Sequence, residues 1–362
     1  MALNKINLYR INGSLGSVSN IQTSALNNGA LAGVRNRIIN GDMRISQRGT
    51  SFPAAANGYN LDRWQWAKAG AMVCTVSQDN IDVPNASFQN SYKVAVTTAD
   101  TSISSTDYAT VIQRIEGYNV RDLIGTPFTF SFWVKSAKTG THSVAFRNNA
   151  QTRSYIATYS ITAINTWEYK TITVPVGLIN DTGWDWTAGT GLEVVFTLAC
   201  GSAYQAPTDT WRVGNFLGAS AQVNVMDNVV NTFYLTGAQL EPGPVATPFE
   251  RRSIEQELQF CYRYFKILSH YGGAFTGANV CYFTPEGMNN FRATPSVAST
   301  VNGFQFYNNS VWTTASTSTG ATLSIYLAPN NTVAIQVDGL SGNGTVPTPT
   351  ALGFIGTLSA EL

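Results

Sequence analysis

The chain has 362 residues, a formal net charge of +1 and only 12% charged side chains. A charged share about half of the usual ~25%, without a basic cluster, argues against nucleic acid as a partner. No run of about 18 apolar residues occurs, so we expect no membrane insertion. Aromatic residues reach 12% and the chain has 31 glycines, a balance typical of many short β-strands joined by tight turns.

Residues 1–35 are predicted to form an extended N-terminal arm. Their apolar residues are isolated among Asn, Gly and Ser, and so sparse a pattern cannot bury a core. The arm is either flexible or ordered only against a partner protein. It lacks the apolar run and the small-residue cleavage site of a signal peptide, so export by that route is not expected.

Residues 36–250 are predicted to contain about eight to ten antiparallel strands that form a two-sheet sandwich. In PFTFSFWVKS the alternation places Phe128, Phe130, Phe132 and Val134 on one face, which is typical of a half-buried strand. The opposite face of this strand carries Thr129, Ser131, Trp133 and Lys135. Further runs of this kind are MVCTVS, YKVAVTT, ATVIQRIEG and HSVAFRN.

Two other runs indicate where strands lie within the sheets. TITVPV predicts a strand with Ile172, Val174 and Val176 directed inward, and Pro175 places it at an edge or a bulge. GLEVVFTLAC, which begins at Gly191, is apolar on both faces and is expected to lie deeper in the sandwich.

The segment from Thr232 onward predicts a buried strand that ends at Leu240, because the following EPGP cannot continue a ladder. A helix of about four turns is expected next. Ser253 and Gln256 match the capping box, and an apolar stripe at helical spacing consists of Leu258, Tyr262 and Phe265. Residues 251–270 are therefore interpreted as a helical linker.

Residues 271–362 are predicted to form a small C-terminal β-domain. Short alternating runs such as ATLSIYLA and TVAIQVDGL are separated by turn residues. The charged residues of this region are only Glu286, Arg292, Asp338 and Glu361. So few charges favour a surface that is covered by homotrimerisation, although Thr, Ser and Asn also solvate a surface.

Two segments resemble a known family. The run LTGAQLEPGPVATPFERRSIEQELQFCYRYF (residues 235–265) is similar to the closing segment of many bacteriophage tail-fibre and minor structural proteins. RIINGDMRISQRGTSF (residues 37–52) and GYNLDRWQW (residues 58–66) resemble the opening of the same module. The resemblance implies a jelly-roll-like antiparallel β-sandwich, related in shape to carbohydrate-binding modules and carried on a virion.

This resemblance also sets the expected location and partners. We expect a tail or head appendage of the virion, made in the cytoplasm of the host bacterium. The arm would attach the chain to other virion proteins, and the β-domains of a homotrimer would contact glycans of the host surface.

The sequence offers little material for catalysis. Only His142 and His270 are present, neither in a recognisable motif. The four cysteines have no metal-ligand spacing, so we expect buried thiols, no metal site and no cofactor. Carboxylates that a glycosidase could use occur without any pairing in the sequence, and these are Asp62, Glu116, Asp122, Glu168, Asp185, Glu193 and Asp227.

Aromatic loops are the best candidates for sugar binding, because aromatic faces stack on sugar rings while Asp, Asn and Gln bind the hydroxyls. The candidates in the sandwich are Trp184, Asp185, Trp186, Tyr204 and Trp211. In the C-terminal domain they are Tyr307 and Trp312, on either side of Asn308 and Asn309 in the sequence. Packing within the fold is the competing interpretation for all of them.

The leading hypothesis is a non-enzymatic phage fibre or spike component that contributes to adsorption. A purely architectural head-fibre, decoration or baseplate adaptor protein is the first alternative. A polysaccharide depolymerase is the second.

Overall fold

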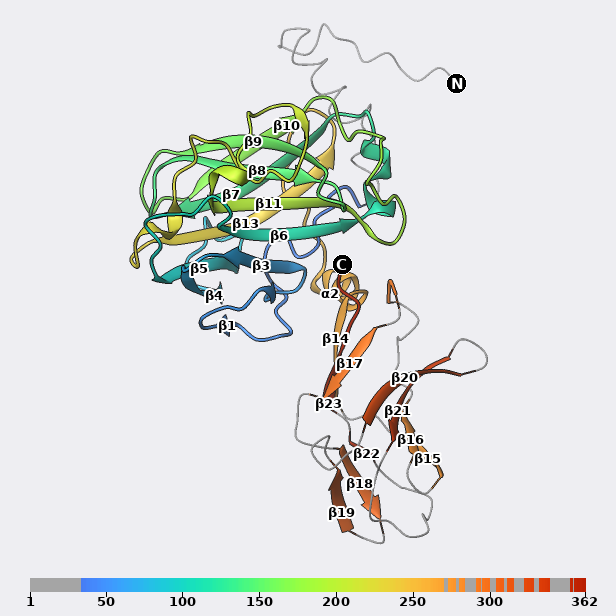
Figure 1. The fold of residues 1–362 in the computed structure, drawn as a ribbon. Helices are drawn as coiled ribbons and strands as arrows, with labels where there is room; N and C mark the ends of the chain where they lie inside the picture. Colours follow the sequence, from blue (N-terminus) through green and yellow to red (C-terminus); the bar gives the residue numbers. More distant parts are fainter. Residues whose placement is uncertain are drawn as a thin grey trace, which may run out of the picture. The chain divides into compact units, whose positions relative to one another are not determined.

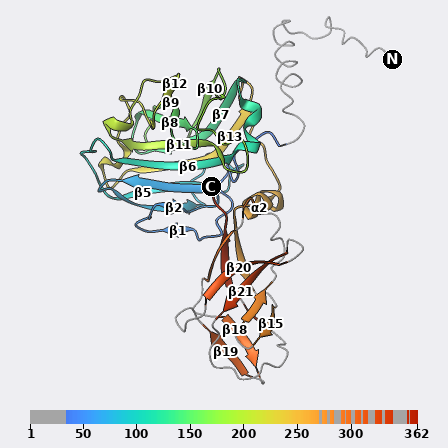
Figure 2. The same ribbon diagram turned by 45° about the vertical axis from the view of Figure 1, so that its right-hand side comes forward.

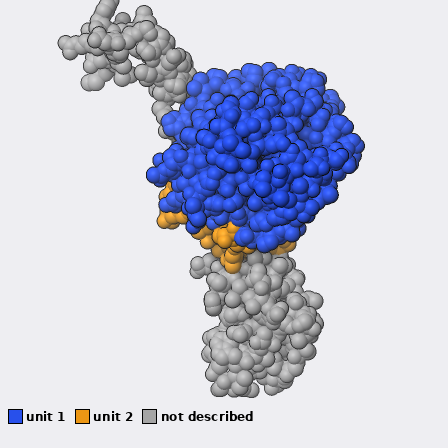
Figure 3. Space-filling view, turned by 90° about the vertical axis from the view of Figure 1, so that its left-hand side faces the viewer, with its two compact units in different colours: residues 1–43, 51–58, 66–251 blue, residues 44–50, 59–65, 252–362 orange. Residues whose placement is uncertain are grey.

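A computed structural model describes residues 34–269, 273–277, 280–283, 291–293, 295–299, 304–308, 311–315, 322–328, 332–338, 352–353 and 355–362. The chain divides into two compact units (Figure 3). Unit 1 consists of the residues up to 43, 51–58 and 66–251, and unit 2 of residues 44–50, 59–65 and 252–362. Most of the predicted N-terminal arm, residues 1–33, lies outside the described residues.

Unit 1 is built on two antiparallel sheets that face each other (Figure 1 and Figure 2). The six-stranded sheet has the order β1 (Ser51–Phe52), β4 (Val73–Asp79), β5 (Ser91–Thr98), β13 (Thr232–Pro242), β7 (Phe128–Ser136) and β10 (Glu168–Val174). The seven-stranded sheet has the order β12 (Trp211–Val213), β9 (Arg153–Ile161), β8 (Gly140–Arg147), β11 (Thr190–Cys200), β6 (Tyr108–Glu116), β3 (Trp64–Ala69) and β2 (Gly58–Tyr59). Between the strands lie the short 3-10 turns η2 (Gly117–Asn119), η3 (Arg121–Leu123), η4 (Ser202–Tyr204) and η5 (Val225–Asp227).

This arrangement confirms the predicted all-β, jelly-roll-like antiparallel sandwich. The predicted number of strands was too low, since the two sheets contain thirteen. The missed strands include β9, whose sequence was not recognised, and β1, β2 and β12, which are two or three residues long. Strands this short carry too little alternation to be seen in a sequence.

The core of the sandwich depends on the inward face of β7. Phe128, Phe130, Phe132 and Val134 are fully buried, as predicted. Ring contacts cross from β7 to the other sheet, because the Phe132 ring centroid lies 4.9 Å from that of Phe196 in an edge-to-face arrangement. Other ring contacts between the two sheets join Phe130 to Phe146, Phe130 to Phe196 and Phe132 to Tyr159.

The two other predicted strands of unit 1 are also present. β10 lies at the edge of its sheet, and Ile172 and Val174 are buried as predicted. The inward placement of Val176 was wrong, because the strand ends at Val174 and Val176 lies in the following turn with 58% of its surface exposed. β11 is buried along its whole length between β6 and β8, as expected.

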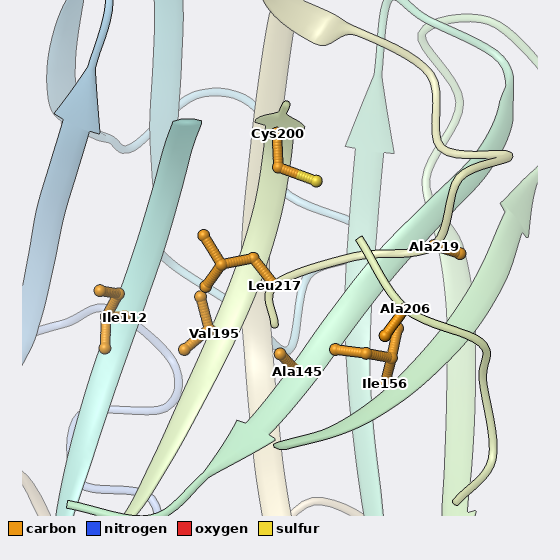
Figure 4. Close-up of a cluster of buried hydrophobic side chains, with 8 residues drawn as sticks. All are labelled: Ile112, Ala145, Ile156, Val195, Cys200, Ala206, Leu217 and Ala219. Carbon is orange, nitrogen blue, oxygen red and sulfur yellow. The ribbon is translucent and has the colours of Figure 1, made fainter. Parts of the chain in front are cut away.

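A loop covers the outer face of the seven-stranded sheet. Outward-facing residues of the strands form a hydrophobic cluster with Ala206, Leu217 and Ala219 of the loop (Figure 4). Side chains of the sheet fasten the loop, since Thr197 Oγ1 donates to the Leu217 carbonyl at 2.6 Å and Ser143 Oγ accepts from Ala219 N–H at 3.1 Å. The outer face of this sheet is therefore largely occupied by the chain itself.

The predicted helix is part of unit 2. Ser253 caps α2 (Ile254–Tyr262) and its side chain accepts a hydrogen bond from the Gln256 N–H at 3.2 Å, which confirms the predicted cap. The predicted length of about four turns was wrong, because the helix has 9 residues. Phe265, assigned to the helical stripe, begins strand β14 (Phe265–Ser269) instead.

The remaining described elements of unit 2 are strands in three small sheets, in agreement with the expected β-structure. The first has the order β14, β23 (Ile355–Ser359) and β17 (Ser296–Ser299). The second has the order β15 (Gly273–Gly277), β16 (Val280–Phe283), β21 (Thr332–Asp338) and β20 (Thr322–Ala328). The third has the order β19 (Val311–Ala315), β18 (Phe304–Asn308) and β22 (Leu352–Gly353).

The two segments that carry the family resemblance contact each other within both units. In unit 1, Arg37 N–H donates to the Leu240 carbonyl at 2.8 Å, and Ala238 N–H donates to the Gly41 carbonyl at 2.9 Å. A Cβ on Gly41 would lie 2.2 Å from the Ala238 oxygen, so only glycine fits there.

In unit 2, the buried Arg63 forms an ion pair with Glu361 and its Cζ atom lies 3.5 Å from the centroid of the Tyr264 ring. Arg48 pairs with the same carboxylate at 2.9 Å and covers the Phe265 ring. These contacts give both segments a structural role. The predicted domain boundaries at residues 250 and 270 stay predictions.

The described part of the chain contains no helix that is both long and apolar enough to cross a membrane. Cys74, Cys200 and Cys261 are buried free thiols, as expected.

Stability of unit 1 is expected to fall in mild acid because of His142. The ring is fully buried and stacks on Tyr159, its Nε2 lies 3.0 Å from the Lys138 carbonyl, and burial lowers the pKa of His142 to about 4. An unfolded histidine has a pKa of about 6.5, so below that pH the unfolded chain binds a proton that the folded chain does not. Stability is unaffected above pH ~6.5 and should decline by up to about 3 kcal/mol as the pH falls to ~4.

Urea unfolding measured at several pH values between 7 and 4.5 tests this expectation. His142→Gln keeps a donor for the Lys138 carbonyl but cannot titrate, so the variant should lose less stability on acidification than the natural chain. If the stability of the two proteins depended on pH in the same way, His142 would not be the group responsible.

Candidate functional site

A groove of about 790 Å³ lies on the outer face of the six-stranded sheet, within unit 1. Its volume falls in the range of roughly 300–1,000 Å³ that is usual for ligand sites. The lining residues come from β7, β10 and β13 and from two loops, and they are Asn85, Ser87, Phe88, Thr129, Ser131, Trp133, Tyr169, Thr171, Thr173, Gly237, Pro244, Val245, Ala246, Thr247, Pro248, Phe249 and Arg251.

The floor of the groove is made of cross-strand pairs between β7 and β10. The register pairs Thr173 with Thr129, Thr171 with Ser131, and Tyr169 with Trp133. Because side chains alternate along a strand, these are the neighbours of the inward-facing phenylalanines and they share the opposite face. The three pairs extend over roughly 13 Å.

One end of this floor is aromatic and the other carries hydroxyl groups. The Trp133 and Tyr169 ring centroids lie 5.3 Å apart at an angle of 48°. Trp133 is half-buried and Tyr169 is 44% exposed, while the hydroxyls of Thr171 and Thr173 belong to exposed residues. A partly exposed aromatic surface beside hydroxyl groups can stack on a sugar ring and bind its hydroxyls.

The segment from Gly243 to Arg251 forms one wall, and a buried carboxylate holds it in place. Glu241 is fully buried and accepts hydrogen bonds from the N–H of Thr247 at 2.8 Å, the hydroxyl of Thr247 at 2.6 Å and Nε2 of Gln239 at 2.8 Å. Glu250 N–H donates to Oε1 of Gln239 at 2.7 Å. These bonds fix the wall to β13, so the groove is formed before any ligand binds.

Two aromatic rings and an arginine form one corner of the groove, close to Trp133. The Phe88 and Phe249 centroids are 5.5 Å apart, and Phe88 is buried. The guanidinium carbon of the exposed Arg251 lies 4.8 Å from the Phe88 centroid and 5.7 Å from that of Phe249. Cation–π contacts of this geometry limit the orientations of the arginine side chain but do not neutralise its positive charge.

Glycine is required where β13 crosses the groove. Gly237 has a φ of +61° at a bulge between Thr236 and Gln239. A Cβ at this position would lie 2.9 Å from Cζ of Phe88 and 3.1 Å from Cδ1 of Trp133. The missing side chain therefore leaves room for both groove rings.

Three of the candidates predicted from the sequence, Trp184, Trp186 and Trp211, lie together at the edge of the seven-stranded sheet. The Trp184 and Trp186 rings are stacked with centroids 5.1 Å apart, and the Trp184 ring meets Trp211 at 75°. Nε1 of Trp184 donates to Asp181 at 2.9 Å, and Nε1 of Trp211 donates to the Gly177 carbonyl at 2.8 Å. These ring contacts and hydrogen bonds hold the loop in place. Sugar binding by the three tryptophans stays a prediction.

The other candidates occupy different places. Asp185 belongs to the same loop, but its carboxylate accepts hydrogen bonds from the N–H and hydroxyl of Thr187 at 2.7 and 2.5 Å. The Tyr204 ring packs on the hydrophobic cluster of Figure 4 and meets Tyr108 at a centroid distance of 5.5 Å. The side chains of Tyr307 and Trp312, in β18 and β19, lie outside the described part of the structure.

Several of the carboxylates considered for catalysis form ion pairs. Glu193 pairs with Arg147 at 2.6 Å and Arg114 at 2.8 Å, and Glu168 pairs with Lys170 at 2.6 Å. Asp122 and Asp227 pair with Arg37 and Lys138. Among the described residues, no three His, Cys, Asp or Glu side chains are grouped closely enough to hold a metal ion.

Sequence reasoning did not identify the groove. Trp133 was recognised only as a member of the outer face of its strand, and Tyr169, Phe88 and Arg251 were not predicted to bind a ligand. The available signal was an aromatic residue on the polar face of an otherwise amphipathic strand. The wall could not be found in this way, because it depends on contacts between distant segments.

Comparisons with known proteins found matches among solved structures only. No protein-family model matches the chain, and no curated protein matches it. The solved structures that resemble it include the bacteriophage CBA120 tailspike protein 4 enzymatically active domain, at 19% identity and a TM-score of 0.29. That match covers 53% of this chain and 22% of the tailspike chain, so the present chain spans only about a fifth of it.

Carbohydrate-binding modules are also among the structural neighbours. A putative sugar binding protein from Bacteroides thetaiotaomicron is 12% identical with a TM-score of 0.33, and the match covers 58% of this chain and all of that one. The family 11 carbohydrate-binding module from Clostridium thermocellum, solved with a mixed-linked tetrasaccharide, is 10% identical with a TM-score of 0.29, and the match covers 55% and 99% of the two chains.

Replacing Gly237 by alanine should destabilise unit 1 and disturb the groove. Gly125→Ala is the matched control, because Gly125 has a φ of +62° and nothing within 4 Å of an added Cβ. Both variants strain the backbone, by roughly 1–2 kcal/mol. Gly237→Ala should lose about 1–3 kcal/mol more, since its methyl group overlaps Phe88 and Trp133.

Urea unfolding followed by tryptophan fluorescence measures both effects. The native emission of Gly237→Ala should also differ from that of Gly125→Ala. Indistinguishable stabilities and spectra would show that the groove rings do not pack on Gly237.

Proposed function

We propose that this chain is a non-enzymatic component of a bacteriophage fibre or spike and that its sandwich domain binds glycans of the host surface. Glycan binding is supported by the preformed groove and by the aromatic surface that Trp133 and Tyr169 form in it. The virion part is supported by the two segments, residues 37–66 and 235–265, that resemble phage tail-fibre and minor structural proteins.

The arrangement of the groove suits a saccharide better than an apolar ligand. Its aromatic rings occupy one end, and the rest of the floor is lined by threonine and serine. Tyr169, Thr171 and Thr173 lie on an edge strand and are all exposed, so an extended chain could reach them in sequence. The loop that carries Trp184 and Trp186, here called the tryptophan loop, is less suited to bind a sugar. The two rings stack on each other, so one face of each ring is already covered.

The sandwich would act as the adhesive part of a larger assembly. In this proposal the N-terminal arm contacts other virion proteins and the chains associate as homotrimers. Binding without cleavage fits the groove, because no Asp or Glu is among its lining residues and glycoside hydrolysis generally requires a pair of carboxyl groups across the scissile bond.

Tyr169→Ala should weaken binding to host polysaccharide by roughly tenfold or more, because a stacked aromatic side chain contributes at least about 1.4 kcal/mol. Tyr118→Ala is the matched control, since Tyr118 is 62% exposed but does not line the groove. Both exposed residues can be replaced without opening the core. Binding is measured by isothermal titration calorimetry, and the same mixtures are assayed for new reducing ends.

Equal affinities for the natural chain and Tyr169→Ala would contradict sugar binding in the groove. Loss of binding in Trp186→Ala with Tyr169→Ala unaffected would place the sugar on the tryptophan loop instead. No selective binding at all would favour an architectural role, and new reducing ends would show that the protein is a depolymerase.

The virion location has its own test. Antibody raised against the purified chain should label intact phage particles at a tail or head appendage in negative-stain electron microscopy. Particles that remain unlabelled while infected-cell lysate contains the antigen would contradict the assignment to a fibre or spike.

A further inference from the structure

We propose that the groove selects acidic glycans and that Arg251 is the residue that binds their carboxylate or phosphate group. This inference rests on the proposed glycan-binding function. It starts from the charges around the groove, whose lining contains one cation, Arg251, and no Asp or Glu.

The positive charge of Arg251 is not neutralised by the protein. Within the described residues its guanidinium forms no ion pair or hydrogen bond, and its contacts are with the Phe88 and Phe249 rings. The adjacent Glu250 directs Oε2 to the backbone N–H groups of Arg35 and Asn36, each at 2.8 Å. The neighbouring carboxylate of Glu241 is buried by Gln239 and Thr247.

Two lysines on strands of the six-stranded sheet are already paired. Lys135 pairs with Asp82 and its Nζ lies 4.3 Å from the centroid of the Tyr234 ring. Lys93 pairs with Asp79 at 3.1 Å. Arg251 therefore differs from these lysines in having an exposed charge, and it is the one that lines the groove.

The aromatic corner makes Arg251 suitable for anion recognition. Stacking on Phe88 and Phe249 limits the orientations of a long side chain, so less entropy is lost when a ligand binds. The planar guanidinium offers paired N–H donors that match a carboxylate or a phosphate, and such charge-assisted bonds are among the stronger polar contacts. An anion at this corner would meet no carboxylate among the residues that line the groove.

The ligand class follows from combining the aromatic and hydroxyl-bearing floor of the groove with Arg251. A neutral saccharide would use Trp133, Tyr169 and the threonine hydroxyls but would leave Arg251 without a partner. A saccharide that carries a uronic acid, a sialic acid or a phosphate group would use all of them. Acidic capsular or cell-wall polysaccharides of bacteria have this chemistry.

The test compares polysaccharides that differ only in charge. A panel of capsular polysaccharides whose only charged groups are carboxylates is prepared from host strains, each in its native form and after chemical reduction of these carboxylates to alcohols. Binding of the full chain is measured by biolayer interferometry at low and high salt. Arg251→Gln is compared with Arg121→Gln, which removes the same charge from an exposed site outside the groove.

Native acidic polysaccharide should bind roughly 10- to 100-fold more tightly than its reduced form. Arg251→Gln should lose this preference and most of the salt dependence, while Arg121→Gln should keep both. Arg251→Lys should recover only part of the affinity, because an ammonium group lacks the paired donors.

Equal binding of native and reduced forms, or an unchanged preference in Arg251→Gln, would overturn the acidic specificity and leave glycan binding intact. Absence of binding to every polysaccharide of the panel, native or reduced, would overturn the proposed function itself.

Discussion

The alternation of side chains along β7 is the constraint on which the rest of the sandwich depends. One face of this strand supplies Phe130 and Phe132, which join the two sheets through ring contacts with Phe196. The other face supplies Thr129, Ser131 and Trp133 to the groove. A shift of one residue in register would exchange the two sets, so the core and the candidate site are fixed by the same pairing.

The two outer faces of the sandwich differ in how far loops of the chain cover them. The seven-stranded sheet is covered by a loop that Ser143, Ser154 and Thr197 fasten through their hydroxyls. On the six-stranded sheet the segment after β13 is instead held along one side by the buried Glu241, which leaves a groove beside it. Polar side chains thus decide which face stays accessible.

Much of the fold could be predicted from local patterns, and most of the site could not. The alternation of PFTFSFWVKS, the uninterrupted apolar run of β11 and the Ser253 cap each act over a few residues and are visible in the sequence. Val176 was misplaced because a pattern does not show where a strand stops. The groove requires Phe88, Trp133 and Arg251 to meet, and no local pattern brings residues so far apart in the chain together.

The central claim is that sugar binds on the Trp133 face and not at the tryptophan loop. The chain contains 8 tryptophans, whose indole N–H signals can be resolved by NMR after assignment with single Trp→Phe variants. During titration with host polysaccharide fragments, the Trp133 signal should shift progressively while those of Trp184, Trp186 and Trp211 stay in place. Shifts confined to the three loop tryptophans, with Trp133 unchanged, would contradict the account.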